Sequence, residues 1–168
     1  HMQTQAVESL ARTVRDDEGD TIFGIDGEVE DMLLRYCERW GAEQHFTLVG
    51  EGLPTEGVEF GRAGLGGPPF RLLVDPIDGT RGLMFDKRSA WCLMGCAPDR
   101  GPAAKLQEVE VAVMTELPTT RQNISDVIWA VAGQPAQAER HDLVRHTEAP
   151  LAIVPSTARD VRHGFASV

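Results

Sequence analysis

Residues 70–80, FRLLVDPIDGT, place two aspartates and a threonine directly after a short apolar run. Asp75 and Asp78 lie three residues apart, and Pro76 restricts the backbone between them, so a turn at a strand end can direct both carboxylates toward one volume. Crowded carboxylates repel one another unless a cation lies between them. Mg2+ takes oxygen ligands and commonly binds through one or two carboxylates plus substrate phosphate. The segment therefore predicts a magnesium site; the alternative is a solvated turn, because Asp, Pro and Gly are common turn residues.

A third carboxylate follows another apolar run. Residues 46–49, FTLV, end in Gly50 and Glu51, which places an acidic side chain just past a second predicted strand. Two strand ends then carry three carboxylates, and this context favours a metal site over an isolated turn.

The order and spacing of Asp26, of Gly50 with Glu51, and of residues 75–80, DPIDGT, resemble the inositol monophosphatase family. That family is part of a larger group that includes fructose-1,6-bisphosphatases and lithium-sensitive nucleotide phosphatases. The resemblance extends from Gly19 to Gly133. It implies an α+β protein with the layered α/β/α/β/α sugar-phosphatase fold. It also implies a homodimer that hydrolyses a small phosphate monoester, such as an inositol phosphate or a related sugar phosphate, with magnesium.

The resemblance implies a site with two metal ions. Glu51, Asp75 and the backbone carbonyl of Ile77 would hold one Mg2+, while Asp75 and Asp78 would contribute to a second, so that Asp75 bridges the two. Two metal ions can activate a water molecule, stabilise the leaving oxygen and neutralise the phosphate. A covalent phosphoenzyme is then not required.

The resemblance also assigns residues to catalysis and substrate binding. Thr80, with Asp26 as its acidic partner, would orient the attacking water, and Glu51 would be catalytic as well as metal-binding. The backbone amides of Gly79 and Thr80 would bind the phosphate. Asp26 also precedes a predicted helix and can cap it, and capping need not exclude water orientation.

Three cationic residues follow the motif. Arg81, Lys87 and Arg88 precede the apolar run at residues 90–96. They are interpreted as phosphate contacts, as contacts with a neighbouring subunit, or as an ordinary charged connector.

The remaining pattern predicts the elements that position these residues. Apolar side chains recur at helical spacing from Val29 to Trp40, including Met32, Leu33, Tyr36 and Cys37, so we expect this stripe to lie in the core. Residues 52–69 are rich in Gly and Pro and predict a loop, either a lid or a disordered excursion. Strands are predicted at residues 90–96, 109–117 and 124–131.

Length and the second half of the chain suggest a domain boundary. The 168 residues suit about one ordinary domain, whereas the family folds as two α/β units in a longer chain. We predict an N-terminal metal-binding phosphatase domain at residues 3–133 and a polar linker at 134–148. Residues 149–168 would begin a C-terminal domain, with a strand at 150–154 and a short helix from Thr157, and the remainder of that domain would be absent.

The sequence departs from the family pattern at several positions. Gly52 stands where many members have a second acid, and residues 79–83 read GTRGL where Gly-Thr-x-Asn-Phe is frequent. No Trp-x-Asp type motif follows Val131, and Asp160 does not match one. These departures motivate an alternative function, a catalytically incomplete metal-binding or interaction protein of the same fold. A plain structural domain is a third possibility.

Composition restricts the partners. A formal net charge of −10 disfavours polymeric nucleic acid, whose phosphates would be repelled over most of the surface, whereas bound divalent cations can reverse the local field for a small phosphate. No apolar stretch approaches the roughly 18 residues of a membrane span. Without a visible signal peptide, we expect a cytoplasmic protein that does not bind membranes. Cys37, Cys92 and Cys96 are interpreted as buried, reduced thiols.

Overall fold

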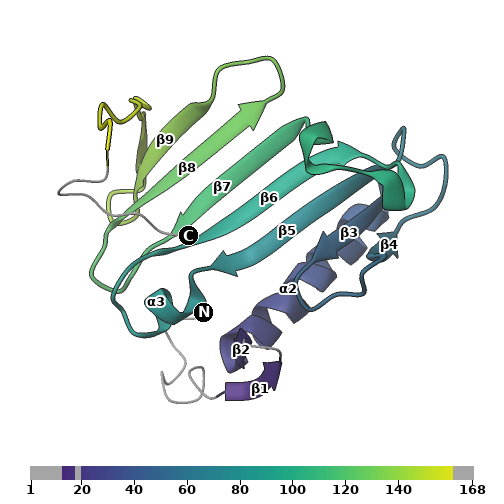
Figure 1. Cartoon of the computed structure of the whole chain (residues 1–168), viewed down its shortest axis with the longest axis horizontal. Coiled ribbons are helices and arrows are strands. Elements are labelled where there is room, and N and C mark those ends of the chain that lie inside the picture. Colours follow the sequence, from purple (N-terminus) through teal and green to yellow (C-terminus); the bar gives the residue numbers. More distant parts are fainter. Residues whose placement is uncertain (1–12, 18–19, 161–168) are drawn as a thin grey trace.

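The computed structural model describes residues 13–17 and 20–160, with side chains from Gly27 onward except that of Pro102. One long helix lies against a large sheet, and a small two-stranded sheet precedes it (Figure 1). The elements are β1 (Thr13–Asp17), β2 (Asp20–Phe23), α2 (Gly24–Gly41), β3 (Phe46–Gly50), β4 (Val58–Phe60), β5 (Phe70–Asp78), α3 (Thr80–Met84), β6 (Ala90–Pro98), two 3-10 turns (Gly101–Ala103 and Leu106–Glu108), β7 (Val111–Leu117), β8 (Ile124–Val131), β9 (Gln137–Asp142) and β10 (Thr147–Pro150). The predicted α+β class is confirmed.

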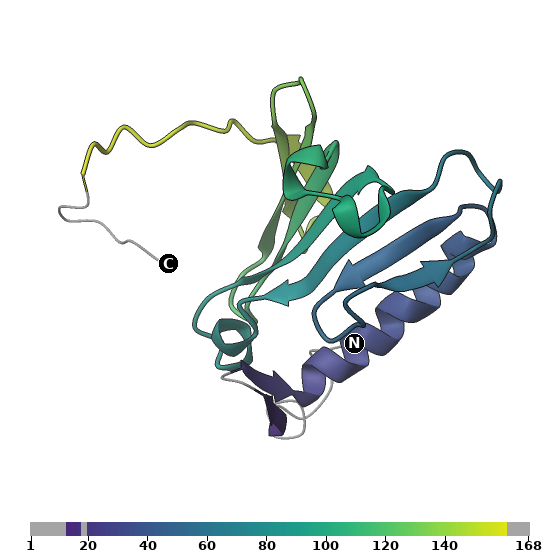
Figure 2. The ribbon, with the colours of Figure 1, turned by 45° about the vertical axis from the view of Figure 1, so that its right-hand side comes forward.

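The large sheet has eight strands in the order β10-β9-β8-β7-β6-β5-β3-β4. β3 and β5 run parallel, while every other neighbouring pair is antiparallel. Figures 1 and 2 show α2 lying along the β3, β4 and β5 end of this sheet. The other strands extend away from the helix toward β9.

The core forms where α2 packs on β3 and β5. Alternate residues of these strands point to the helix side, and Phe46, Leu48, Leu72 and Val74 are buried there against Cys37 of α2. Leu33, Leu34 and Met94 pack around the same cluster. The Phe46 ring also stacks on Phe60 and Phe70, with ring centroids 5.4 and 5.3 Å apart respectively. These contacts fix the register of the two parallel strands.

The predicted apolar stripe of α2 is only partly in the core. Cys37 and Val29 are buried as expected, but Met32, Tyr36 and Trp40 are 47%, 43% and 44% exposed. Because successive residues turn about 100° around a helix, a stripe this wide extends past the line of contact with one sheet. The prediction that the whole stripe is buried was therefore wrong.

The Gly-rich segment contains a strand that the sequence did not predict. Residues 58–60 form β4, which pairs with β3, and the segment around it is made of turns. Gly57 shows why glycine is needed there: its φ is +88°, and a Cβ would lie 2.5 Å from the Leu48 carbonyl oxygen. The lid and the disordered excursion are thus both incomplete descriptions, since part of the segment is an edge strand.

The segment expected to be a linker continues the large sheet. β9 pairs with β8, and β10 pairs with β9, across residues 137–150. A strand was predicted at residues 150–154, but β10 ends at Pro150, and residues 151–158 have no regular secondary structure. Most of the helix predicted from Thr157 lies outside the described residues. The local predictions for 134–154 were wrong because polar residues on an exposed sheet edge resemble a loop, while the division into two domains stays a prediction.

Candidate metal centre

The parallel pairing of β3 with β5 positions the predicted ligands. Gly50 and Val74 are partners in the ladder, so Glu51 and Asp75 are the next residues at the same edge of the sheet. A Cβ on Gly50 would lie 2.6 Å from the Val74 carbonyl oxygen, which shows how closely the strands approach here. The fold therefore brings the Gly50-Glu51 pair and the DPIDGT motif to adjacent strand ends.

A bulge in β5 determines where Asp78 points. The sequence predicts that the strand ends before Asp75, but β5 continues to Asp78 and pairs with β6. Asp75 is opposite Leu93 and Asp78 is opposite Trp91, so three steps along β5 match two steps along β6. Residues three apart in a regular strand face opposite sides, whereas the extra residue returns Asp78 to the side of Asp75. The motif thus forms a bulged strand end instead of a simple turn.

Hydrogen bonds order the backbone of the motif. The Ile77 amide donates to Asp75 Oδ1 at 3.1 Å, and the Thr80 hydroxyl donates to the Ile77 carbonyl at 2.8 Å. Between them Gly79 adopts φ +93°, a left-handed conformation that glycine tolerates best. Ile77 is buried, Asp75 is half-buried, and Asp78 and Glu51 are exposed.

The donor set of this strand end fits magnesium. Glu51, Asp75 and Asp78 offer carboxylate oxygens, and the Ile77 carbonyl retains a second lone pair beside its bond with Thr80. In the described part of the chain, however, the three carboxylates do not form a group of ligand atoms within 4.8 Å of one another. Asp26 is in the first turn of α2, and its side chain lies outside the described residues. The ligand set therefore remains a prediction.

The thiols near the site are held neutral. Burial raises the pKa of the Cys92 thiol, and the negative charge of Asp75 raises that pKa further. Burial and the charge of Glu110 raise the pKa of Cys96, and none of the three cysteines forms a disulfide. Cys37 is buried as expected, but Cys92 and Cys96 are only half-buried.

A different compact group of ligand atoms was missed from the sequence. Among the described residues, Glu139, His141 and Glu148 bring three ligand atoms within 4.8 Å of one another. Glu148 is the direct partner of His141 across β9 and β10, and each Glu lies 3.8 Å from one ring nitrogen of His141. The alternation of Glu139 and His141 in a strand was the available signal. The group is partly exposed, and β8, β7 and β6 separate it from β5.

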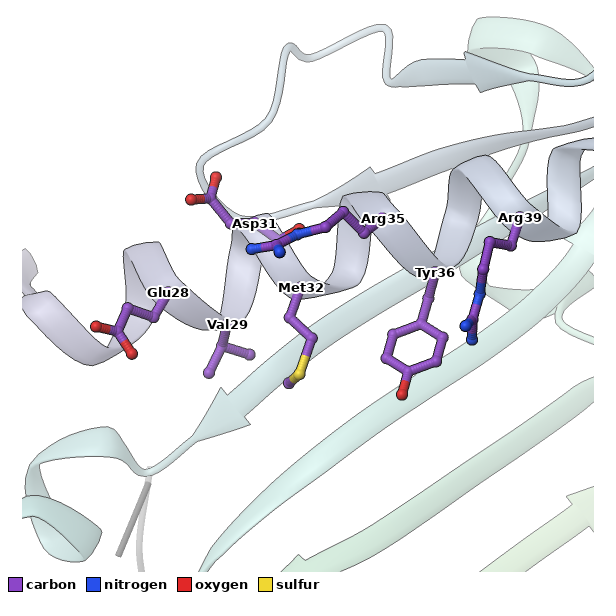
Figure 3. Close-up of a pocket in the computed structure, with 7 residues that line it drawn as sticks. All are labelled: Glu28, Val29, Asp31, Met32, Arg35, Tyr36 and Arg39. Atoms are coloured by element: carbon purple, nitrogen blue, oxygen red, sulfur yellow. The ribbon is translucent and has the colours of Figure 1, made fainter. Parts of the chain in front are cut away.

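The hollows among the described residues include one along α2 and one beside the predicted metal centre. One, of about 600 Å3, follows α2, where Val29, Met32, Tyr36 and Arg39 point to the same side of the helix (Figure 3). It contains none of the predicted site residues. The other, of about 550 Å3, is largely apolar and adjoins the metal centre, because its lining includes Asp75 together with Val49, Leu73, Leu93, Met114 and Ile128.

Comparison with solved structures finds a similar fold. The crystal structure of Leishmania major fructose-1,6-bisphosphatase in holo form matches with a TM-score of 0.61 and 12% sequence identity, over 86% of this chain and 45% of that chain. The chain thus spans less than half the length of that protein. No protein-family model matches the sequence, and no curated protein matches it. None of the helices that the structure describes combines the length and apolar character required to cross a bilayer. The shared architecture over most of this chain is therefore the α+β fold of that bisphosphatase structure.

Proposed function

We propose that the protein hydrolyses a small phosphate monoester, an inositol phosphate or a related sugar phosphate, by magnesium-dependent attack of water. The observation that carries this proposal is the meeting of two strand ends, where Glu51 follows β3 beside Asp75, and the bulge turns Asp78 to the side of Asp75. The fold of the bisphosphatase structure supports the same class of reaction. A cytoplasmic homodimer belongs to the same proposal.

The residues of the strand end have separate roles in this reaction. Glu51, Asp75, Asp78 and the Ile77 carbonyl would hold Mg2+, which supplies Lewis acidity and a more acidic bound water. Thr80 donates its proton to the Ile77 carbonyl, so its oxygen is oriented to accept a hydrogen bond from the attacking water.

The substrate phosphate would bind beside this water. Gly79 and Thr80 would contribute backbone amides as donors, and the left-handed Gly79 exposes that backbone without a side chain. Asp26, at the start of α2, would complete the orientation of the water.

Phosphate release from a panel of small phosphomonoesters tests the proposal. This chain, and the full gene product where it is longer, are assayed with and without Mg2+. Asp78→Asn, which keeps the shape of the side chain but removes its charge, should lower kcat/KM by about 100-fold or more. The control Glu56→Gln removes an exposed carboxylate outside the predicted set and should leave kcat/KM unchanged. Turnover that persists in EDTA, or in Asp78→Asn, would contradict the proposal.

A metal-binding or interaction protein without turnover is the second candidate. It is favoured by the apolar hollow beside Asp75, a surface that suits a docking partner as well as a substrate. Magnesium binding measured by calorimetry, with no phosphate released from any ester by the folded full gene product, would favour this candidate.

A further inference from the structure

The side chain of Arg88 lies across α3 and reaches the DPIDGT motif. If Gly82 carried a Cβ, that atom would lie 2.5 Å from Arg88 Cγ and 2.7 Å from Arg88 Nε. A Cβ on Gly79 would lie 3.7 Å from Arg88 Nη2. The aliphatic part of Arg88 thus occupies the space that a side chain at residue 82 would fill, and the guanidinium extends to Gly79.

The backbone holds Arg88 in this position. The amides of Lys87 and Arg88 both donate to the Gly82 carbonyl, at 2.9 and 3.3 Å. The loop after α3 is therefore tied to the same residue that the Arg88 side chain crosses. With Arg88 in this position, residue 82 has no room for a Cβ.

The guanidinium of Arg88 is available for a ligand. Within the part of the chain that the structure describes, no side-chain hydrogen bond or ion pair involves it, and it is exposed. Some arginines of the described part are paired with carboxylates: Arg71 with Asp99, Arg121 with Asp86, Arg140 with Asp126 and Arg145 with Asp142. Arg88 is one of the arginines without such a partner, and it is the one whose guanidinium lies beside Gly79. A guanidinium beside the Gly79 backbone can bind an anion that the backbone amides of Gly79 and Thr80 also contact.

We propose that Arg88 binds the phosphate group of the substrate, and of the inorganic phosphate product, at Gly79 and Thr80. The proposal rests on the proposed function for the identity of the ligand. The planar guanidinium can donate two parallel hydrogen bonds to a phosphate, which a lysine ammonium cannot do with the same geometry. Arg88 is a binding residue in this scheme. It supplies positive charge for the phosphate beside a motif whose side chains are negatively charged.

Binding of inorganic phosphate in the presence of Mg2+, measured by calorimetry, tests this assignment without turnover. Arg88→Gln should weaken phosphate binding by about 10- to 100-fold, the range expected for a charge-assisted hydrogen bond. Gly82→Ala should also weaken binding, because the added methyl group displaces the Arg88 side chain. The control Arg62→Gln removes an exposed positive charge that has no role in the predicted site, and should leave the affinity unchanged.

The outcomes separate the two proposals. If the folded wild type does not bind phosphate, or if Arg88→Gln binds it within about twofold of wild type, the role of Arg88 is wrong. If phosphate binding depends on Arg88 but no ester is hydrolysed, the role of Arg88 stands and the proposed reaction falls. Arg88→Lys guards against a folding defect, because it keeps the positive charge. Its affinity for phosphate should lie between those of wild type and Arg88→Gln. A double variant with Gly82→Ala and Arg88→Gln should bind phosphate no more weakly than Arg88→Gln alone, because Gly82→Ala acts through the Arg88 side chain.

Discussion

Thr80 donates a 2.8 Å hydrogen bond from its hydroxyl to the carbonyl oxygen of Ile77. This bond joins the residue proposed to orient water to the carbonyl proposed to hold a metal ion. The position of one group therefore depends on that of the other, and the bulge in β5 fixes both.

Removing the Thr80 hydroxyl tests that link. Thr80→Ala should lower kcat by about 100-fold, because the attacking water loses its acceptor, while Thr80→Ser should remain within a few-fold of wild type. Thermal unfolding should change far less than kcat, since each hydrogen bond contributes about 1 kcal/mol. Steady-state kinetics and the melting temperature of both variants measure this, and equal losses in the two variants would indicate a different role for the side chain.

Gly50 should be intolerant of substitution because of the close approach of β3 and β5. Gly50→Ala places a methyl group 2.6 Å from the Val74 carbonyl oxygen, and should destabilise the fold by about 1–3 kcal/mol and weaken magnesium binding. Gly27→Ala is the matched control, since no atom lies within 4 Å of its added Cβ in α2. That change should stabilise the protein by about 0.5 kcal/mol. Urea denaturation measures the free energy of unfolding, and calorimetry measures magnesium affinity. If Gly50→Ala left the free energy of unfolding unchanged, the close packing of β3 and β5 would be contradicted.

Asp99 should make stability depend on acid pH. Burial of Asp99 opposes its ionisation, but hydrogen bonds from Arg71, the Gly101 amide and Thr47 outweigh burial and lower its pKa. The unfolded state then binds more protons than the folded state in this pH range. The stabilisation is thus complete above the ordinary Asp pKa of about 3.9 and is lost as pH falls through the lower, folded-state pKa.

Asp99→Asn provides the measurement of this effect. At pH 7 the variant should unfold more easily by about 1.5–3 kcal/mol, because it loses charge-assisted bonds. Its deficit relative to wild type should shrink as the pH falls below about 4. Urea titrations at a series of pH values give the difference, and a deficit that does not vary with pH would exclude this carboxylate as the cause.

Cys37 should react slowly with alkylating reagents in the folded protein. Its thiol is buried with 0% exposure, and burial raises its pKa to about 11. Only about one thousandth of the thiol is then ionised at pH 8, and the thiolate is the reactive form. Iodoacetamide labelling followed by mass spectrometry should modify the half-buried Cys92 and Cys96 first. In denaturant the three rates should become similar, and fast labelling of native Cys37 would show that the α2 packing is wrong.

Local chemistry was predictable from the sequence because short-range features express it. The run of apolar residues before Glu51 and before Asp75 predicted the two strands β3 and β5. The α+β class came from the family resemblance, and the structure has it. The roles of Glu51, Asp75, Ile77, Asp78 and Thr80 came from the family resemblance and remain to be measured.

Strands at the sheet edges were harder to predict. β4 has only three residues, and β9 and β10 are rich in polar residues, so no local pattern distinguishes these strands from loops. Their formation depends on pairing with neighbouring strands. The exposure of Met32 and Tyr36 likewise depends on how far the sheet extends beneath α2.

The sequence by itself determined which groups are available: three carboxylates, a carbonyl and a hydroxyl at two strand ends, in an acidic chain. Only the tertiary structure decided their arrangement. The parallel register set Glu51 beside Asp75, and one extra residue in β5 brought Asp78 to the same side. The missing side chain at Gly82 let Arg88 reach the motif. The first two relationships depend on the pairing of strands that are separate in the sequence, and the third depends on the course of the loop after α3. Composition and periodicity encode neither.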